Sequence, residues 1–305
     1  MTGRRRYNLL DHIGETPLLH IQNIELPDGV NLFAKAEWFN PGGSIKDRSI
    51  SRIIEDGEKK GALTQGKILL DATSGNAGIA YAMIGAAKGY KVELAMPSNV
   101  SLERKRLISS YGATLHFTDP LEGSDGAIRR ARKIYAEDPD RFFYGDQYNN
   151  LANVRAHYES TGVEIINQIP SEPTAFVAGI GTSGTLTGTG RRLREKYPEV
   201  KIIAVEPEGP LHGIEGLKNM ESSIVPGIYD KNFPDEIFSI NTEDAQRTAR
   251  LLARVEGLLV GTSSGANVYA SMEIAKRISE GTIVTILPDA GERYLSEKYW
   301  NDAMP

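Results

Sequence analysis

Cysteine is absent from the 305 residues of the chain. Its absence excludes disulfides, thiolate metal sites, haem-thiolate ligation and a catalytic cysteine. Long apolar runs are also missing, since no segment approaches the ~20 continuous apolar residues that a membrane span requires. No charge of one sign dominates, because the formal net charge is only −5. We therefore expect neither nucleic acid nor a membrane surface as a partner.

Histidine is scarce as well. The five histidines stand at positions 12, 20, 116, 157 and 212, and no two of them have a close metal-ligand spacing such as H-x-x-x-H. We expect each to be a packing or surface residue, and we expect no metal site. The arginines at 4–6 are followed by "YNLLDHIGETP" and not by a long apolar stretch. This pattern is untypical of a signal peptide and favours a cytoplasmic protein.

Short β-rich apolar runs alternate with longer segments of helical period through most of the chain. This alternation predicts an α/β protein with open, twisted, mostly parallel sheets flanked by helices. "NNLANVRAHYESTG", near residues 150–160, interrupts the alternation and indicates a boundary between two α/β layers. No fixed-period repeat is present, which excludes solenoids and propellers. The predicted strands are 31–39, 67–72, 91–96, 114–118, 174–180, 201–206 and 282–287.

"FNPGGSIKDRSI", at residues 39–50, places Lys46 at the start of a predicted helix. Ser44 and Asp47 have the spacing of a capping box, which favours a solvated lysine. Against this, a lysine in the first helical turn faces the positive end of the helix dipole, which disfavours its ammonium form. Such a lysine is biased toward the free amine that nucleophilic chemistry requires. The local sequence leaves both interpretations open.

Two glycine-rich loops follow predicted strands, and a third stands at 261–266. The loop at 179–184 fits G-x-G-x-x-G before a helix that begins near Thr185, and Glu206 ends the next strand where a ribose-binding acid stands in dinucleotide enzymes. An NAD-dependent oxidoreductase is therefore one interpretation. The loops at 71–78 and 261–266 offer hydroxyl and amide side chains beside helix N-termini, which suit a small carboxylate. A pyridoxal phosphate enzyme would use the lysine motif and two of these loops together.

Seven motifs carry a resemblance to a known family. "NPGGSIKDR", "TSGNAG", "MPSNVSLERKRLISSYGA", "HYESTGVEI", "GIGTSGTLTGTGR", "GTSSGA" and "LPDAGERYLS" occur in the order of the cysteine synthase family, the O-acetylserine sulfhydrylases. The resemblance spans roughly residues 8 to 299. It implies a two-domain, fold type II pyridoxal phosphate enzyme, similar to the tryptophan synthase β-subunit. A larger domain would comprise 1–44 and 156–305, and a smaller, mobile domain, 45–155, would close over the substrate of a homodimer.

The resemblance also implies an activity. An O-activated serine, acetylated or phosphorylated, would lose its β-substituent to leave an aminoacrylate, and a sulfur nucleophile would add to give L-cysteine. Lys46 would hold the cofactor as a Schiff base and transfer the α-proton. The further cofactor-binding residues implied are Asn76, Gly181, Thr182, Ser183, Gly184, Thr185, Ser264 and Asp289. The implied substrate-binding residues are Thr73, Ser74, Gly75, Asn76, Ala77, Gln147 and Lys218.

Three positions depart from the family pattern. Ala77 replaces a usual threonine, Ser183 replaces a usual glycine, and Ala290 stands where the family commonly places the serine that bonds the pyridine nitrogen. The segment 210–230 resembles the B-type, O-phosphoserine-using branch. There Lys218 would meet a phosphorylated leaving group, although the local sequence slightly favours a solvated lysine.

Several alternatives stay open on the residues alone. Cystathionine β-synthase carries almost the same lysine motif, and a serine dehydratase would stop at the aminoacrylate and release pyruvate. The sulfur donor is also undetermined, with sulfide, thiosulfate and a carrier-protein thiocarboxylate as candidates. A sulfur-carrier protein and a regulatory peptide are partners that the family sometimes uses.

Overall fold

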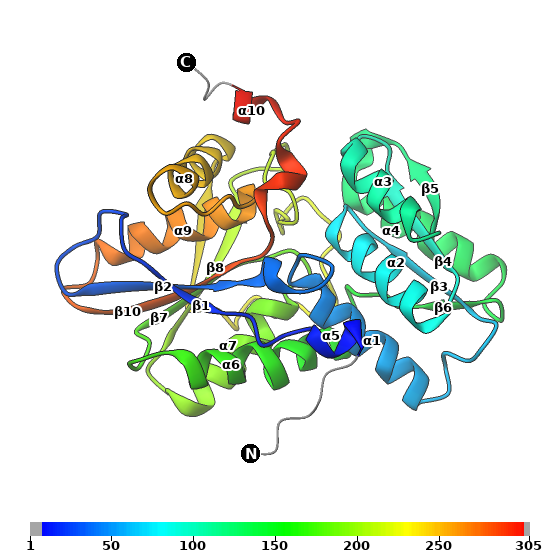
Figure 1. Ribbon diagram of the computed structural model, residues 1–305, viewed down its shortest axis with the longest axis horizontal. Coiled ribbons are helices and arrows are strands. Elements are labelled where there is room, and N and C mark those ends of the chain that lie inside the picture. The colour runs from blue at the N-terminus through cyan, green and yellow to red at the C-terminus, as the bar shows by residue number, and fades with distance from the viewer. Residues whose placement is uncertain (1–7, 302–305) are drawn as a thin grey trace.

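Ten strands form two separate sheets in the computed structural model, which describes residues 8–301 (Figure 1). The six-stranded sheet has the order β1-β2-β10-β7-β8-β9, and all its pairs are parallel except β1 with β2. Its strands are β1 (Leu18–Ile21), β2 (Val30–Ala36), β7 (Ala175–Gly179), β8 (Lys201–Pro207), β9 (Glu236–Ile240) and β10 (Gly281–Leu287).

The four-stranded sheet is parallel throughout and has the order β5-β4-β3-β6. Its strands are β3 (Ile68–Ala72), β4 (Val92–Pro97), β5 (Thr114–Thr118) and β6 (Phe142–Tyr144). Every residue of β3 is buried, as expected for a central strand covered on both faces. All seven predicted strands are present, with ends that differ by up to three residues.

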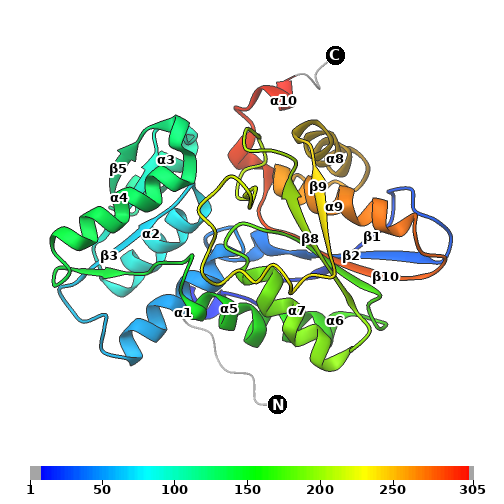
Figure 2. The same ribbon diagram turned by 180° about the vertical axis from the view of Figure 1, so that it is seen from behind.

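Helices cover both faces of each sheet (Figures 1 and 2). The six-stranded sheet lies between α8 and α9 on one face and α6 and α7 on the other. In the four-stranded sheet, α1 to α3 share a core with one face and α4 packs on the opposite face. These helices are α1 (Lys46–Lys59), α2 (Asn76–Lys88), α3 (Leu102–Ser110), α4 (Gly123–Glu137), α6 (Gly162–Gln168), α7 (Gly184–Lys196), α8 (Thr242–Val255) and α9 (Thr262–Ala275).

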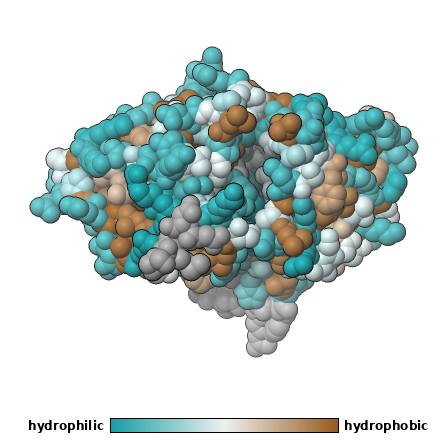
Figure 3. All heavy atoms as spheres, turned by 90° about the horizontal axis from the view of Figure 1, so that it is seen from above, coloured by the Kyte–Doolittle hydropathy of each residue, from teal (hydrophilic) through white to brown (hydrophobic). Residues whose placement is uncertain are grey.

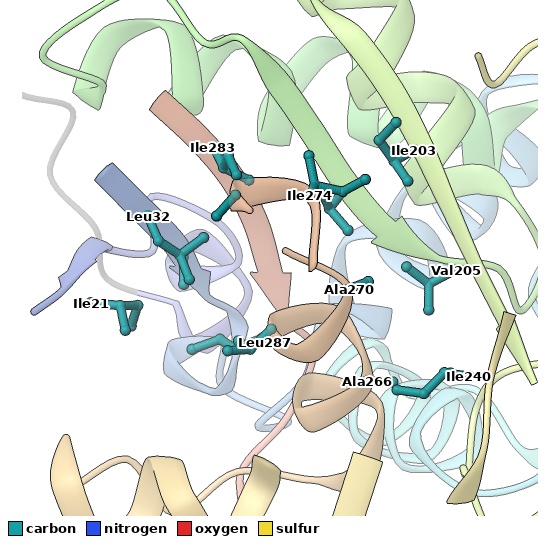
Figure 4. Packing of buried hydrophobic residues seen from close by; sticks show 14 of the residues in the cluster. Ile21, Leu32, Ile203, Val205, Ile240, Ala266, Ala270, Ile274, Ile283 and Leu287 are labelled. Atoms are coloured by element: carbon teal, nitrogen blue, oxygen red, sulfur yellow. The ribbon is translucent and has the colours of Figure 1, made fainter. Parts of the chain in front are cut away.

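The largest core lies between α9 and the six-stranded sheet (Figure 4). Ala266, Ala270 and Ile274 recur at helical spacing along α9 and face Leu32 of β2 and Ile283 of β10. The small alanines let the helix approach the sheet closely, while the β-branched strand residues fill the space between them. This packing fixes the carboxyl ends of β2, β7 and β10, which is the edge from which the loops of the candidate site extend.

A continuous helical segment, residues 151–168, lies between β6 and β7. It comprises α5 (Leu151–Ala156), a π-helical turn η4 (His157–Thr161) and α6, without an intervening loop. The predicted domain limit at 155/156 therefore falls inside a continuous helical segment. The remaining short elements are η1 (Leu9–His12), η2 (Glu37–Phe39), η3 (Pro120–Glu122), η5 (Gly291–Tyr294) and α10 (Lys298–Asn301). Within residues 8–301, no helix has both the length and the apolar character that a bilayer crossing demands.

Candidate active site

Lys46 is the first residue of α1 and follows the turn that leaves β2 and η2. The predicted capping box is wrong. The Ser44 hydroxyl accepts a hydrogen bond from the Lys46 N–H at 3.2 Å and not from the Asp47 N–H, and the Asp47 carboxylate accepts from the Gly42 N–H and not from Ser44. The Asp47 carboxylate instead bridges the two ends of the turn at 42–47, where it satisfies the buried N–H group of Gly42.

Lys46 lies where two cavities meet. It lines a small cavity of about 60 Å³ and also a cleft of about 630 Å³ between the two sheets. Figure 3 shows the molecule hollowed near the middle of one face, with apolar side chains on either side of the hollow. Burial lowers the pKa of the Lys46 amine to about 8. The side chain of Lys46 is partly exposed at the junction of the two cavities, and the cause of its lowered pKa is burial and not the helix dipole.

The loop at 181–185 lines the small cavity beside Lys46. Gly181, Thr182, Ser183 and Thr185 contribute to the lining, and α7 begins at Gly184. A Cβ atom at Gly181 would stand 2.2 Å from the Gly216 carbonyl oxygen, so only glycine fits there. Ser183 has φ +70°, a conformation that favours glycine, and its buried hydroxyl has no hydrogen-bond partner within residues 8–301. The loop thus offers a helix N-terminus and an unused hydroxyl group to an anion.

The loop at 73–77 lines the cleft on the opposite side of Lys46. The Thr73 hydroxyl oxygen accepts hydrogen bonds from the Gly75 and Gly78 N–H groups, each at 2.9 Å. Gly75 has φ +154°, and a Cβ atom there would stand 2.8 Å from Cδ of Arg104. The cleft is lined by Thr73, Ser74, Asn76, Ala77 and Gln147 of the predicted carboxylate site.

A buried carboxylate, that of Asp71, lies next to the loop at 73–77 and accepts several hydrogen bonds. Asp71, at the end of β3, accepts hydrogen bonds from the Tyr81 hydroxyl at 2.6 Å, the Ala72 N–H at 2.7 Å and the Gln147 N–H at 3.2 Å. Burial raises the pKa of Asp71 to about 7. The Gln147 side chain donates to the Ala72 carbonyl oxygen at 2.8 Å. Gln147 is therefore held against the loop, although it lies 70 or more positions away in the sequence.

The Asn76 side chain is bonded at both ends. Its amide nitrogen donates to Asp289 Oδ2 at 2.6 Å, and its oxygen accepts from Arg293 at 2.6 Å. The Tyr294 hydroxyl donates to the same Asp289 oxygen at 2.6 Å. An amide nitrogen carries two hydrogens, so Asn76 keeps one donor for a ligand. Asp289 thus acts on Asn76 in this structure, and neither cavity includes Asp289 in its lining.

The third glycine-rich loop places a different serine at the cavity from the predicted one. Ser264 is fully buried behind the small cavity, whereas Ser263 lines it together with Asn267. Ala290 pairs with Val260 through its backbone and lines neither cavity. The sequence did not single out Ser263, because two adjacent serines in the first turn of α9 have the same local context. Which of them faces the cavity depends on how α9 packs against β10.

Lys218 is buried in the cleft, so the interpretation as a solvated lysine is wrong. Only 4% of its surface is exposed. Its ammonium group lies 2.6 Å from Asp125 Oδ1 and 3.3 Å from the Ile224 carbonyl oxygen, and it stands 5.1 Å from the centre of the Tyr148 ring. Asp125 Oδ2 accepts from the Ile224 N–H at 2.6 Å. Lys218 therefore lines the cleft with an acid already beside it.

A second ion pair crosses the cleft and was not predicted. Arg104 of α3 is buried and forms an ion pair with Glu215, which lines both cavities. The guanidinium stacks on the Tyr294 ring, 4.5 Å from its centre, and its Nε has no hydrogen-bond partner among the described residues. The sequence motif "LERKR" contains this arginine, but its neighbours Lys105 and Arg106 offer the same charge, so the motif alone does not single it out.

Known proteins match this chain over nearly its whole length. A family model described as pyridoxal-phosphate dependent enzyme matches residues 9–289. The chain belongs to this family. A cysteine synthase of Aquifex aeolicus is 50% identical over 98% of this chain and 94% of its own, and a probable cysteine synthase of Bacillus subtilis is 40% identical over 96% and 97%. The crystal structure of a cysteine synthase from Entamoeba histolytica superimposes with a TM-score of 0.91 at 37% identity, covering 99% of this chain and 92% of the other.

Membership of the pyridoxal-phosphate-dependent family confirms the predicted cofactor, the enzyme class and the α/β fold. It does not favour the NAD-dependent interpretation of the loop at 179–184. The residues present also fit the cofactor chemically, because two residues that line the small cavity have a buried polar atom without a partner within residues 8–301. These atoms are Ser183 Oγ and Asn267 Oδ1.

Proposed function

We propose that this enzyme makes L-cysteine by β-replacement, from an O-activated serine and a sulfur nucleophile. The observation that carries the proposal is the position of Lys46. Its amine lies at the junction of a cavity lined by the loop at 181–185 and a cleft lined by the loop at 73–77. The curated relatives named cysteine synthase, at up to 50% identity, support the same reaction.

Pyridoxal phosphate, when bound, supplies an aldehyde that joins amines and a ring that withdraws electrons from the substrate α-carbon. We assign its phosphate to the loop at 181–185, where N–H groups at the start of α7 and three hydroxyl side chains converge. Asn76 keeps one amide hydrogen for the phenolic oxygen. Ser263 is the hydroxyl of α9 that reaches the cavity, so we assign it, in preference to Ser264 or Asp289, to the ring nitrogen.

Lys46 carries the proton between the reacting carbon and its own amine. A general base works best when its pKa lies near the working pH, and a pKa of about 8 meets this condition. The loop at 73–77 holds the substrate carboxylate through the N–H groups at the start of α2 and the hydroxyls of Thr73 and Ser74, with Gln147 beside them. Ala77 contributes its N–H group only, since it lacks the hydroxyl that the family usually has.

We further propose that residues 45–155 move as a smaller body that closes over the substrate, and that the enzyme acts as a homodimer in the cytoplasm. Exposed leucines support the first part, because Leu121 and Leu211 line the cleft from opposite sides and are 94% and 97% exposed. Two such side chains gain burial if the cleft narrows. Sedimentation velocity with and without an O-activated serine tests the dimer and the movement. The sedimenting mass reports the homodimer, and a lower frictional ratio with the substrate reports closure.

A spectral titration tests the proposed reaction. Purified enzyme should be yellow, and Lys46→Ala should bleach it while leaving the fold intact by circular dichroism. O-acetylserine and O-phosphoserine, added side by side with sulfide, should give cysteine in preference to pyruvate. Pyruvate as the main product would instead indicate a dehydratase, and a preference for homocysteine over sulfide would indicate a cystathionine β-synthase. Thiosulfate and a carrier-protein thiocarboxylate should be compared with sulfide as donors in the same assay.

A further inference from the structure

Two buried side chains of one helical segment contact the two threonine hydroxyls of the loop at 181–185. Asn153 of α5 and His157, the first residue of η4, are four positions apart and each is 1% exposed. The Asn153 amide nitrogen donates to Thr182 Oγ1 at 3.0 Å and to the Gln147 carbonyl oxygen at 2.9 Å. His157 Nε2 lies 3.3 Å from Thr185 Oγ1, and its Nδ1 lies 3.0 Å from Thr161 Oγ1.

Glycines in α7 make this approach possible. A Cβ atom at Gly184 would stand 2.0 Å from Asn153 Oδ1, and one at Gly188 would stand 2.2 Å from the Val154 carbonyl oxygen. These two glycines are four positions apart, about one helical turn, with Thr185 between them, and both lie against the segment 153–158. Glycines let two helix backbones approach more closely than larger residues allow. Here the close approach brings the side chains of Asn153 and His157 within reach of the threonine hydroxyls.

The direction of each hydrogen bond decides what the threonine hydroxyls can do next. A hydroxyl has one proton to donate, and an amide nitrogen can only donate. Thr182 Oγ1 receives the Asn153 amide hydrogen and, at 3.4 Å, the Gly184 N–H. Its own proton is therefore left for another acceptor. A bound phosphate is such an acceptor, because a dianionic phosphate offers oxygens without protons.

We propose that Asn153 and His157 are positioning residues that direct the Thr182 and Thr185 hydroxyl protons toward the cofactor phosphate. At the second site the ring proton of His157 sits on Nε2 and is donated to Thr185 Oγ1, while the Thr161 hydroxyl donates to Nδ1. Both threonines are then acceptors toward the helix and donors toward the phosphate. This inference rests on the proposed assignment of the phosphate to the loop at 181–185.

The surroundings of His157 keep its ring neutral, as this arrangement requires. Burial, together with the nearby positive charges of Arg48 and Lys46, holds the pKa of His157 well below its ordinary value, against the opposing effect of Glu164. A neutral ring has one donor and one acceptor nitrogen, and the group on one side fixes the role of the other. The Thr161 hydroxyl, at 3.0 Å from Nδ1, is the closer of the two threonine hydroxyls to the ring, and in the proposed arrangement it donates to Nδ1.

The test compares two variants of the same histidine. In His157→Gln the side-chain amide reaches the Nε2 position and still donates to Thr185, whereas in His157→Asn it reaches only the Nδ1 position. The full-length apoenzyme of each is titrated with inorganic phosphate by calorimetry, and the cofactor-loaded enzyme is examined by phosphorus NMR. His116→Gln is the matched control, because His116 pairs with Glu93 at the surface of the four-stranded sheet. Thr161→Val, which keeps the side-chain shape, tests the distal partner independently.

We expect His157→Asn and Thr161→Val to weaken phosphate binding by roughly 10- to 100-fold, the value of one charge-assisted hydrogen bond. His157→Gln and His116→Gln should stay within about threefold of the native chain. In the Thr185→Val background, His157→Asn should have no further effect. Equal loss in the Gln and Asn variants, or no loss in the Asn variant while Thr185→Val binds phosphate poorly, would overturn the inference. If neither Thr182→Val nor Thr185→Val changes phosphate affinity, the assignment of the phosphate loop itself fails.

Discussion

Lys218 offers a direct test of which activated serine the enzyme prefers. Its ammonium group lies 2.6 Å from Asp125, and the two side chains are 5% and 19% exposed. A phosphoserine brings a charge of roughly −1.5 to −2 into the cleft, whereas acetylserine brings a neutral ester. A hydrogen bond from a buried cation to such a group contributes about 1.5–3 kcal/mol, which is roughly a 10- to 150-fold difference in kcat/KM.

We therefore expect Lys218→Met to lower kcat/KM for O-phosphoserine by about 10- to 100-fold and to change that for O-acetylserine by less than about threefold. Asp125→Asn should act in the opposite sense, because it removes the acid that competes with the phosphate for the ammonium group. Lys218→Arg, which keeps the charge, serves as the control for packing. The assay is the initial rate of cysteine formation from sulfide, with each serine derivative well below its KM.

Two results would refute this reasoning. Equal turnover of O-phosphoserine by Lys218→Ala and the native chain would show that the ammonium group does not meet the leaving group. Equal losses with both substrates would show that Lys218 only holds the cleft together through Asp125. Thermal unfolding of each variant separates the second case from a general loss of stability, since removal of one partner of a buried pair costs several kcal/mol.

Three further predictions concern the cofactor site. Lys46→Arg should keep the positive charge but bind no cofactor covalently, so borohydride treatment followed by mass spectrometry should add the cofactor mass only to the native chain. Gly181→Ala should weaken cofactor binding at least about 100-fold, measured by fluorescence titration of the apoenzyme, because its Cβ would overlap the Gly216 carbonyl oxygen. His157 is buried and neutral when folded but gains a proton when unfolded below pH ~6.5. Relative to that of His157→Gln, the free energy of unfolding of the native apoenzyme should thus fall by up to about 1.4 kcal/mol per pH unit between pH 6.5 and 5, as urea titrations of both chains would show. The comparison with the variant removes the opposite contribution of groups common to both chains, such as Asp71, whose pKa burial raises to about 7.

The sequence predicted most of the fold because its signals are local. Each predicted strand is a short apolar run, and parallel strands bring the turns that follow them to one edge of a sheet. Because β3 and β7 belong to different sheets, this rule alone does not place the loops at 73–77 and 181–185 beside Lys46, and the family motifs were needed to join them. β1 was not predicted as a strand, so its antiparallel pairing with β2 was not predicted either.

The charged partners in the cleft could not be predicted in the same way. Asp125 and Lys218 are separated by 93 positions, and Arg104 and Glu215 by more than 100. Each of these side chains stands in an ordinary polar context, so its sequence neighbourhood describes a solvated residue. His157 was expected to be a packing or surface residue, and the spacing Asn153-x-x-x-His157 does indicate one helical face. What that face contacts is decided by two glycines in a different helix.

The two ion pairs across the cleft have a consequence for how substrate binding and closure are connected. Arg104 reaches from α3 to Glu215, and Lys218 reaches back from the same loop to Asp125 of α4. Each pair neutralises a buried cation with an acid from the opposite side, so neither cation can lose its acid and stay buried without a cost in free energy. An anionic substrate that took the place of Asp125 would neutralise Lys218 in its stead. Arg104 and Glu215 would then remain as the ion pair between the two sides. Recognition and linkage then belong to different charges, because Lys218 meets the substrate while Arg104 and Glu215 would join the two sides in the proposed closure.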